Sequence, residues 1–503
     1  MCTRRTVALL ALLVGVMLFQ ICLAEINRSS FPQGFVFGTA SSAFQYEGAV
    51  KEGGRGPSIW DTFSHTFGKV LDFSNADVAV DQYHRFNEDI KLMKDMGMDA
   101  YRFSISWSRI YPNGTGKINQ AGVDHYNNFI NALIANGIEP YVTLYHWDLP
   151  QALEDRYEGW LNPQIINDYS VYVDTCFRVF GDRVKHWITF NEPHTFAVQG
   201  YDDGLHAPGR CSILLHLYCK EGNSSTEPYI VAHHTLLSHA AAVDLYRKKY
   251  QKNQRGAIGI SLDVIWFEAE KNTTDDKDAA ERAQDFQLGW FLEPLVRGDY
   301  PKTMRKRVGI RLPAFSSSEA ALLQGAFDFI GINHYTTFYA RKNSTPILNL
   351  LLRDTLADSG TISLPFRNGK PIGERANSIW LYIYPEGMRK LMNYIRVKYG
   401  NPTVIITENG MDDGNSPFTS REATLKDEKR IAYHREYLTS LLHAIREDGC
   451  DVRGYFAWSL LDNWEWSAGY SSRFGLYYVD YRDRLKRYPK NSVVWFQKFL
   501  NST

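Results

Sequence analysis

Short apolar runs recur along the whole chain and alternate with helical patterns, and this alternation restricts the fold more than any other feature. The segment 86–96 is a typical spacer, with apolar residues at 86, 90, 93 and 96 and then Gly97, which favours a helix end. Strands that alternate with helices form a parallel sheet, and eight such units predict one closed (β/α)8 TIM barrel, an α/β fold. The eight runs lie at residues 35–39, 100–104, 140–145, 187–190, 257–261, 327–331, 403–407 and 452–457.

A doubly wound open sheet is the structural alternative to the barrel. Such sheets usually carry a glycine-rich phosphate loop after the first strand, and no such loop follows residues 35–39. A chain of this length would allow about three domains, although barrels often run long as a single domain. Because no Pro/Ser/Gly-rich tract and no charge block divides the chain, we expect one barrel domain over residues 25–503 with long βα loops.

The first residues have the layout of a secretory signal peptide. Arg4 and Arg5 precede an apolar run over residues 7–23, and Cys22-Leu23-Ala24 resembles a small-x-small cleavage site. A membrane anchor is the alternative, but the run is short for a spanning helix of about 20 residues. We therefore expect residues 1–24 to be cleaved, after which the protein enters the secretory pathway and has no membrane partner.

Two further features agree with secretion. Cys211 and Cys219 lie close together in a polar segment and could form a disulfide in an oxidising compartment, whereas Cys176 and Cys450 are expected to be buried free thiols. Asn-x-Ser/Thr sequons in polar, loop-like sequence are candidate glycosylation sites. These sequons begin at Asn27, Asn223, Asn272, Asn343 and Asn501.

Charge and metal-ligand patterns argue against several classes of partner. The chain holds 56 basic and 56 acidic residues, and the short Arg305-Lys306-Arg307 cluster suits a solvated helix face better than a nucleic-acid site. No spacing of Cys and His indicates a zinc site. We expect no nucleic-acid partner, no metal and no cofactor, and the sequence leaves the oligomeric state open.

Two glutamates stand where a barrel places its catalytic groups, at the C-terminal ends of strands. Glu192 follows the fourth run and Glu408 follows the seventh. A pair of carboxylates is the minimum equipment for breaking a glycosidic bond, since one protonates the leaving oxygen and the other attacks the sugar carbon or activates water. The structural alternatives are a helix N-terminal acid before Pro193 and a turn residue before Asn409-Gly410.

Several longer motifs accompany the two glutamates, in a fixed order along the chain. They are the segments 35–48, 101–109, 145–150 (Tyr-His-Trp-Asp-Leu-Pro) and 457–466. With them the chain resembles glycoside hydrolase family 1, and within that family the secreted plant β-glucosidases, from Phe31 to about Phe499. The resemblance implies an extracellular or cell-wall location, or a vacuolar one reached through the secretory pathway.

The resemblance also implies roles for individual residues. Glu192 would be the general acid/base and Glu408 the nucleophile, with Arg102 and Tyr335 beside Glu408. Glu192 needs a raised pKa to start protonated, and a cation beside Glu408 would lower the pKa of that carboxyl. The residues implied in substrate binding are Gln45, His146, Asn191, Asn333, Tyr335, Trp380, Trp458, Glu465 and Trp466.

The implied activity is that of a retaining β-glucosidase without cofactor, which removes terminal non-reducing β-D-glucosyl residues from small-molecule glucosides. Ile265 in the predicted aglycone wall favours aryl or terpenoid glucosides, with short oligosaccharides as the other substrate class. A retaining transglucosidase would use the same glutamates, and a non-catalytic sugar-binding relative is a further alternative. Trp464 stands where relatives more usually have Phe, which leaves a preference for glucose, fucose or galactose open.

Overall fold

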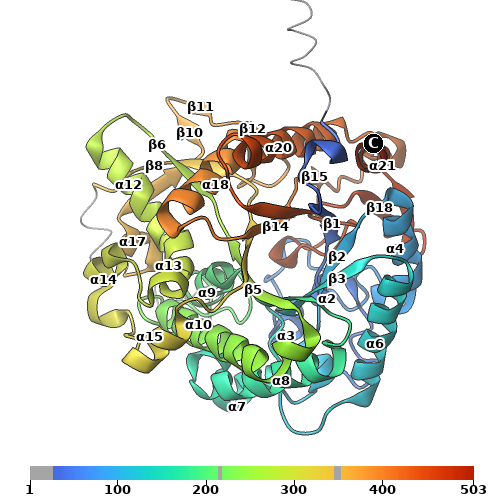
Figure 1. Cartoon of the computed structure of the whole chain (residues 1–503), viewed down its shortest axis with the longest axis horizontal. Coiled ribbons are helices and arrows are strands. Elements are labelled where there is room, and N and C mark those ends of the chain that lie inside the picture. The colour runs from blue at the N-terminus through green and yellow to red at the C-terminus, as the bar shows by residue number, and fades with distance from the viewer. Residues whose placement is uncertain (1–25, 213–217, 345–352, 503) are drawn as a thin grey trace, which may run out of the picture.

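The computed structural model describes residues 26–212, 218–344 and 353–502, and its centre is a closed parallel barrel (Figure 1). Neighbouring strands follow the order β1-β16-β14-β7-β5-β4-β3-β2, and β1 closes the ring by pairing with both β2 and β16. The predicted barrel is therefore confirmed. Its strands are β1 (Val36–Ala40), β2 (Ala100–Ser104), β3 (Glu139–Tyr145), β4 (His186–Asn191), β5 (Ala257–Asp263), β7 (Phe329–Asn333), β14 (Val404–Asn409) and β16 (Val452–Ala457). The predicted signal peptide lies outside the described residues.

Helices surround the barrel on its outside (Figure 1). α8 presents an apolar stripe to the strands, in which Tyr169, Tyr172, Val173, Cys176 and Phe180 are all buried. The helix at the C-terminal end packs against α4, where the Gln497 side chain donates a hydrogen bond to the Asp95 carbonyl at 3.0 Å. The longer helices are α4 (Gln82–Met96), α6 (Gln120–Ala135), α8 (Gln164–Phe180), α10 (Glu227–Tyr246), α18 (Glu386–Tyr399), α20 (Glu428–Arg446) and α21 (Asn491–Asn501).

The apolar spacing predicts one helix at residues 86–96, closed by Gly97, and a second at residues 123–136, closed by Gly137. Both helices form, but both begin earlier than expected. α4 starts at Gln82 and α6 at Gln120, because the first turns are polar and add nothing to an apolar pattern. The predicted stop of α4 is confirmed. Gly97 has φ +85°, a left-handed conformation that costs glycine little, and its N–H donates to the Lys94 carbonyl at 3.0 Å.

Several of the sequence-based strand boundaries need correction by one or two residues. The sixth run was placed at 327–331, but β7 begins at Phe329, because the Asp328 carboxylate accepts the Ile258 N–H at 3.0 Å and lies ahead of the strand. The sequence predicts a long and irregular loop over residues 341–375, but this segment contains short elements. β8 (Thr337–Lys342) pairs antiparallel with β9 (Thr361–Leu364), and α17 (Thr355–Ser359) precedes β9, whereas residues 345–352 lie outside the described part.

The interior of the barrel is tightly filled beside β7. A Cβ atom added at Gly331 would lie 2.4 Å from Ser261 Oγ and 2.8 Å from Thr407 Cγ2. Ser261 and Thr407 belong to the two strands that flank β7, and both are fully buried. A side chain at position 331 would therefore have to displace atoms of both neighbouring strands.

Gly331→Ala is expected to lower the free energy of unfolding by about 1–3 kcal/mol, the usual cost of overpacking a core. Chemical denaturation measures this loss. The double variant Gly331→Ala/Ser261→Ala should recover part of it, since Ser261 Oγ is the nearest obstacle and is buried without a hydrogen-bond partner among the described residues. An unchanged unfolding midpoint for the single variant would show that this packing is not restrictive.

Candidate active site

The C-terminal ends of the barrel strands bring the two glutamates onto one rim. Glu192 follows β4 directly, and Glu408 is the penultimate residue of β14. Asn333, at the end of β7, lies between them in the ring of strands and donates a hydrogen bond to Glu192 Oε1 at 2.7 Å. Both carboxyl groups are buried. The convergence expected from the barrel is thus present in the structure.

Glu408 is held by a buried cation and a phenol. Arg102 forms an ion pair with Glu408 Oε1, and the Tyr335 hydroxyl donates to Oε2 at 2.6 Å. Burial raises the pKa of Glu408 above its ordinary value, and Arg102 and Tyr335 oppose that rise. Arg102 thus lowers the pKa of this carboxyl as expected, but the loss of water around it has the larger effect and leaves the pKa above its ordinary value.

Glu192 has a different environment, with a neutral amide as its hydrogen-bond donor. Burial, the charge of Glu408 and the charge of Asp263 together raise the pKa of Glu192 well above its ordinary value. Glu192 precedes α9 (Pro193–Tyr201) with φ +48°, but its side chain accepts no capping hydrogen bond from that helix. A simple capping role at the helix N-terminus is thus not what this side chain performs.

A chain of amide contacts connects the strand ends. Asn191 Oδ1 accepts from Arg102 Nη2 at 2.6 Å and from Asn333 Nδ2 at 3.0 Å, so its Nδ2 is left to donate to His146 Nε2 at 2.9 Å. Burial lowers the pKa of His146 well below its ordinary value, which makes the ring neutral. A neutral ring that accepts at Nε2 carries its proton on Nδ1. That nitrogen is buried without a partner among the described residues, so it is a free donor for a ligand.

Gln45 and Glu465 meet on the opposite part of the rim. Gln45 Nε2 lies 3.3 Å from Glu465 Oε2 and also donates to the Asn463 side chain at 2.9 Å. Glu465 Oε1 is buried without a partner in the described part of the chain. Burial raises the pKa of Glu465 to about 8, and the charges of Asp412 and Glu408 add to the rise. This carboxyl can therefore exchange hydrogen bonds with ligand hydroxyls as donor or acceptor.

Aromatic rings line the space between these polar groups. The His146 ring lies 6.0 Å from Trp458 and 5.9 Å from Trp466, at interplanar angles of 25° and 18°. Trp380 is different, since it is 43% exposed and meets Tyr335 edge to face at 5.8 Å. The structure therefore separates an enclosed polar region, bounded by Trp458 and Trp466, from a more open side at Trp380.

Comparison with known proteins agrees with this geometry. The model of glycosyl hydrolase family 1 matches residues 27–503. The chain belongs to glycosyl hydrolase family 1. It is 70% identical to β-glucosidase 34 of Oryza sativa subsp. japonica over 99% of both chains, and 71% identical to β-glucosidase 40 of Arabidopsis thaliana over 96% of this chain and 94% of that one.

Solved structures give the same result for the fold. A crystal structure of a rice β-glucosidase superposes with a TM-score of 0.94 at 71% identity, covering 95% of this chain and 100% of that one. A variant of that enzyme in a covalent complex with Glc matches equally well. The predicted family, the (β/α)8 fold and the glycoside hydrolase class are confirmed.

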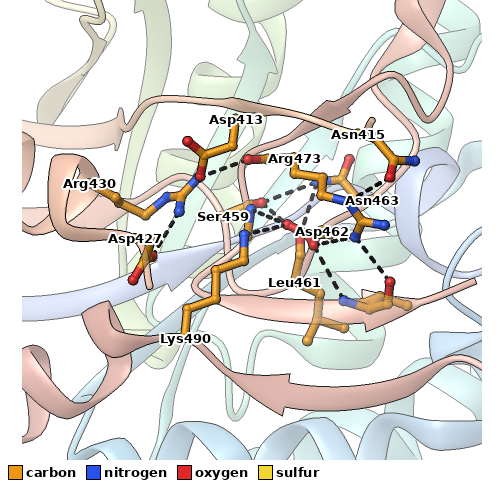
Figure 2. A network of polar contacts seen from close by, with 12 residues as sticks. Asp413, Asn415, Asp427, Arg430, Ser459, Leu461, Asp462, Asn463, Arg473 and Lys490 are labelled. Atoms are coloured by element: carbon orange, nitrogen blue, oxygen red, sulfur yellow. Dashed lines mark hydrogen bonds and ion pairs between the residues drawn. The ribbon is translucent and has the colours of Figure 1, made fainter. Parts of the chain in front are cut away.

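A buried ionic network anchors the loop of this family 1 enzyme that follows β16 (Figure 2). Asp462 is fully buried and accepts from Lys490 Nζ at 2.8 Å, from Arg473 Nη1 at 2.6 Å and from the Gly475 N–H at 3.0 Å. Burial alone would raise the pKa of Asp462, but Lys490 and Arg473 bring it below its ordinary value. The buried ion pairs of Asp462 therefore hold in place the loop that carries Trp458 and Glu465.

Sequence reasoning missed this network and one further support. The Trp147 indole donates to the Asn191 carbonyl at 2.9 Å and so holds the backbone next to Glu192. For Asp462 a signal was present, since an acid inside the apolar and aromatic segment 457–466 needs a buried partner. Nothing near Lys490 in the sequence marks it as that partner.

The remaining predictions concern the cysteines, a membrane-spanning segment and the glycosylation sequons. Cys211 and Cys219 form a disulfide, and Cys176 and Cys450 are buried free thiols, all as predicted. In the described part of the molecule, no helix has the length and apolar character needed to cross a membrane. Among the sequons, Asn223, Asn272 and Asn501 are exposed, whereas Asn27 and Asn343 are half-buried; glycosylation itself stays a prediction.

Lys490→Met is expected to lower the free energy of unfolding by about 3 kcal/mol, because it leaves a buried carboxylate without one of its two cations. The matched control is Lys248→Met. Lys248 pairs with Asp244 at the same distance of 2.8 Å, but its side chain is 75% exposed. The control should change stability by no more than about 0.5 kcal/mol. Equal effects in chemical denaturation would contradict an anchoring role for the network.

Proposed function

We propose that the enzyme is a retaining β-glucosidase that releases terminal non-reducing β-D-glucosyl residues by double displacement. The observation that carries the proposal is the unequal environment of the two carboxyls. Glu408 has a guanidinium and a phenol as partners, whereas Glu192 has an amide donor and carboxylate neighbours. The first therefore suits an ionised nucleophile and the second a protonated acid. The relatives named β-glucosidases support the glucose specificity.

In the first step Glu408 attacks the anomeric carbon while Glu192 gives its proton to the leaving glycosidic oxygen. The new bond joins a Glu408 oxygen to the sugar, and the departing aglycone keeps the electron pair of the broken bond. Esterification removes the negative charge of Glu408, which lowers the pKa of Glu192. Glu192 then accepts a proton from water, and the water oxygen displaces Glu408 from the sugar. Two inversions restore the β configuration.

The glucosyl group is proposed to bind against Trp458 and Trp466, with its hydroxyls toward Gln45, His146 and Glu465. The unpaired His146 Nδ1 and Glu465 Oε1 support this assignment, because buried polar atoms without partners are expected to meet a ligand. Asn191 would donate to the 2-hydroxyl, a contact that strengthens in the transition state.

The aglycone is proposed to lie on the open side, against Trp380. Its half-exposed ring suits a flat aryl or terpenoid group. Ile265, the other residue we expected in this wall, packs on the cluster formed by Phe267, Ala283 and Ala340. We also propose that residues 1–24 direct the enzyme into the secretory pathway; the Cys211–Cys219 disulfide is typical of proteins from that compartment.

Glu408→Gly should abolish hydrolysis, with kcat lower by at least roughly 10³-fold, because the covalent step has no nucleophile. Azide should restore cleavage of an activated aryl β-glucoside. A single displacement inverts the centre, so the product should be α-glucosyl azide, identified by NMR. A variant that keeps near wild-type hydrolysis, or forms the β-azide, would show that Glu408 is not the nucleophile.

Glu192→Gln should slow substrates with poor leaving groups far more than those that release a stable phenolate, since the latter need little protonation. The variant should also lose the fall in kcat/KM at high pH, because that fall marks deprotonation of the acid. The low-pH fall, set by protonation of Glu408, should remain. Equal losses across a series of aryl glucosides would contradict an acid role for Glu192.

A further inference from the structure

One carboxylate beside the active site, that of Asp263, is 14% exposed and has no part in the proposed mechanism. Asp263 ends β5, and its Cα partner on β7 is Asn333, whose amide donates to Glu192. Two residues earlier on the same strand, the Ser261 carbonyl accepts the Glu192 N–H at 2.9 Å. The strand that carries Asp263 is thus joined directly to the backbone of Glu192.

The contacts of Asp263 keep it in place and charged. Its Oδ2 accepts from His194 Nδ1 at 3.1 Å and from Gln287 Nε2 at 3.1 Å, whereas Oδ1 is buried without a partner among the described residues. Burial alone would raise the pKa of Asp263, but His194 and Gln287 bring it below its ordinary value. His194 lies in the first turn of α9, two residues after Glu192, which immediately precedes that helix, so one short segment carries both the acid and the group that holds Asp263.

The groups that face Glu192 come from every side of the rim. β14 contributes Glu408, β5 contributes Asp263, β7 contributes the neutral donor Asn333, and α9 contributes Thr195. Two uncharged side chains lie on the same rim: Tyr335, which donates to Glu408, and the neutral ring of His146. The nearby cation Arg102 donates to Glu408 and Asn191, and the titratable ring of His194 on α9 donates to Asp263. Two negative charges therefore act on Glu192 in the free enzyme.

These two charges behave differently during the reaction. Glu408 loses its charge when it bonds to the sugar, whereas Asp263 takes no part in bond formation and keeps its charge in both steps. We propose that Asp263 is a positioning residue that holds the proton on Glu192 before the first displacement and strengthens Glu192 as a base in the second. This inference rests on the proposed role of Glu192 as the general acid/base.

The test is the pH dependence of kcat/KM for Asp263→Asn, measured on an aryl β-glucoside with a poor leaving group. Removal of the like charge should move the high-pH fall to lower pH by about one unit or more, at the low end of what a neighbouring carboxylate causes. The fall at low pH should move much less. An unmoved high-pH fall would overturn the proposal.

Asp328→Asn is the matched control. Asp328 also binds the β5 backbone, accepting from the Ile258 N–H at 3.0 Å, but at the start of the strand and away from the rim. The Asp328→Asn variant should therefore have the same pH dependence of kcat/KM as the wild type. If Asp263→Asn folds poorly, Asp263→Ser removes the same charge with a smaller side chain and should give the same displacement; a serine variant with the wild-type profile would equally overturn the proposal.

The two single variants together separate this proposal from the assignment of Glu192. If Glu192→Gln keeps the high-pH fall, the general acid is a different group and the proposed function fails in that part. If Glu192→Gln lacks the fall and Asp263→Asn leaves it unmoved, the acid assignment stands and only the role of Asp263 fails. The double variant Glu192→Gln/Asp263→Asn should show no fall of kcat/KM at high pH, because the acid whose pKa Asp263 shifts is absent.

Discussion

The buried guanidinium of Arg102 is the interaction on which the rest of the site depends. From β2 it reaches Thr143 on β3 at 3.2 Å, Asn191 on β4 at 2.6 Å and Glu408 on β14. One side chain thus connects four strands around the interior of the barrel. The planar guanidinium does this better than an ammonium group, because its N–H groups point in fixed directions and each nitrogen can donate to a different strand. Without it Glu408 would be a buried charge with no compensating cation.

The site around that cation contains three carboxyl groups, and these groups differ in their hydrogen-bond partners. Glu408, Glu192 and Glu465 are all buried or nearly so, and burial raises the pKa of each. What distinguishes them is the donor set: a guanidinium and phenol for Glu408, and amides for the other two. Three identical side chains therefore acquire different protonation behaviour from strand ends that the barrel brings together.

Much of this arrangement is predictable from the sequence, and the limits are physical. Strand runs such as 100–104 and 452–457 were placed correctly because apolar residues predominate in each, although Arg102 and Arg453 interrupt the runs. The boundary at Phe329 and the polar first turns of α4 and α6 were missed, since hydrogen bonds rather than apolar spacing define them. Glu192 and Glu408 were identified from strand ends and motifs. Lys490 and Asp263 were not, because their significance depends on which distant residues they meet. The net direction of the pKa of Glu408 likewise required the degree of burial, which no motif states.

The pairing of β1 with β16 has a consequence for how the chain is made. The ring closes only when residues 452–457 are available to β1, and Glu408 can reach Arg102 only after most of the polypeptide has left the ribosome. Until then the first strands form an incomplete sheet whose outer strand offers unpaired N–H and C=O groups to other molecules. Contacts this distant in sequence also slow folding. An open sheet edge that persists until β16 is available is thus a direct consequence of closing this barrel with its last strand.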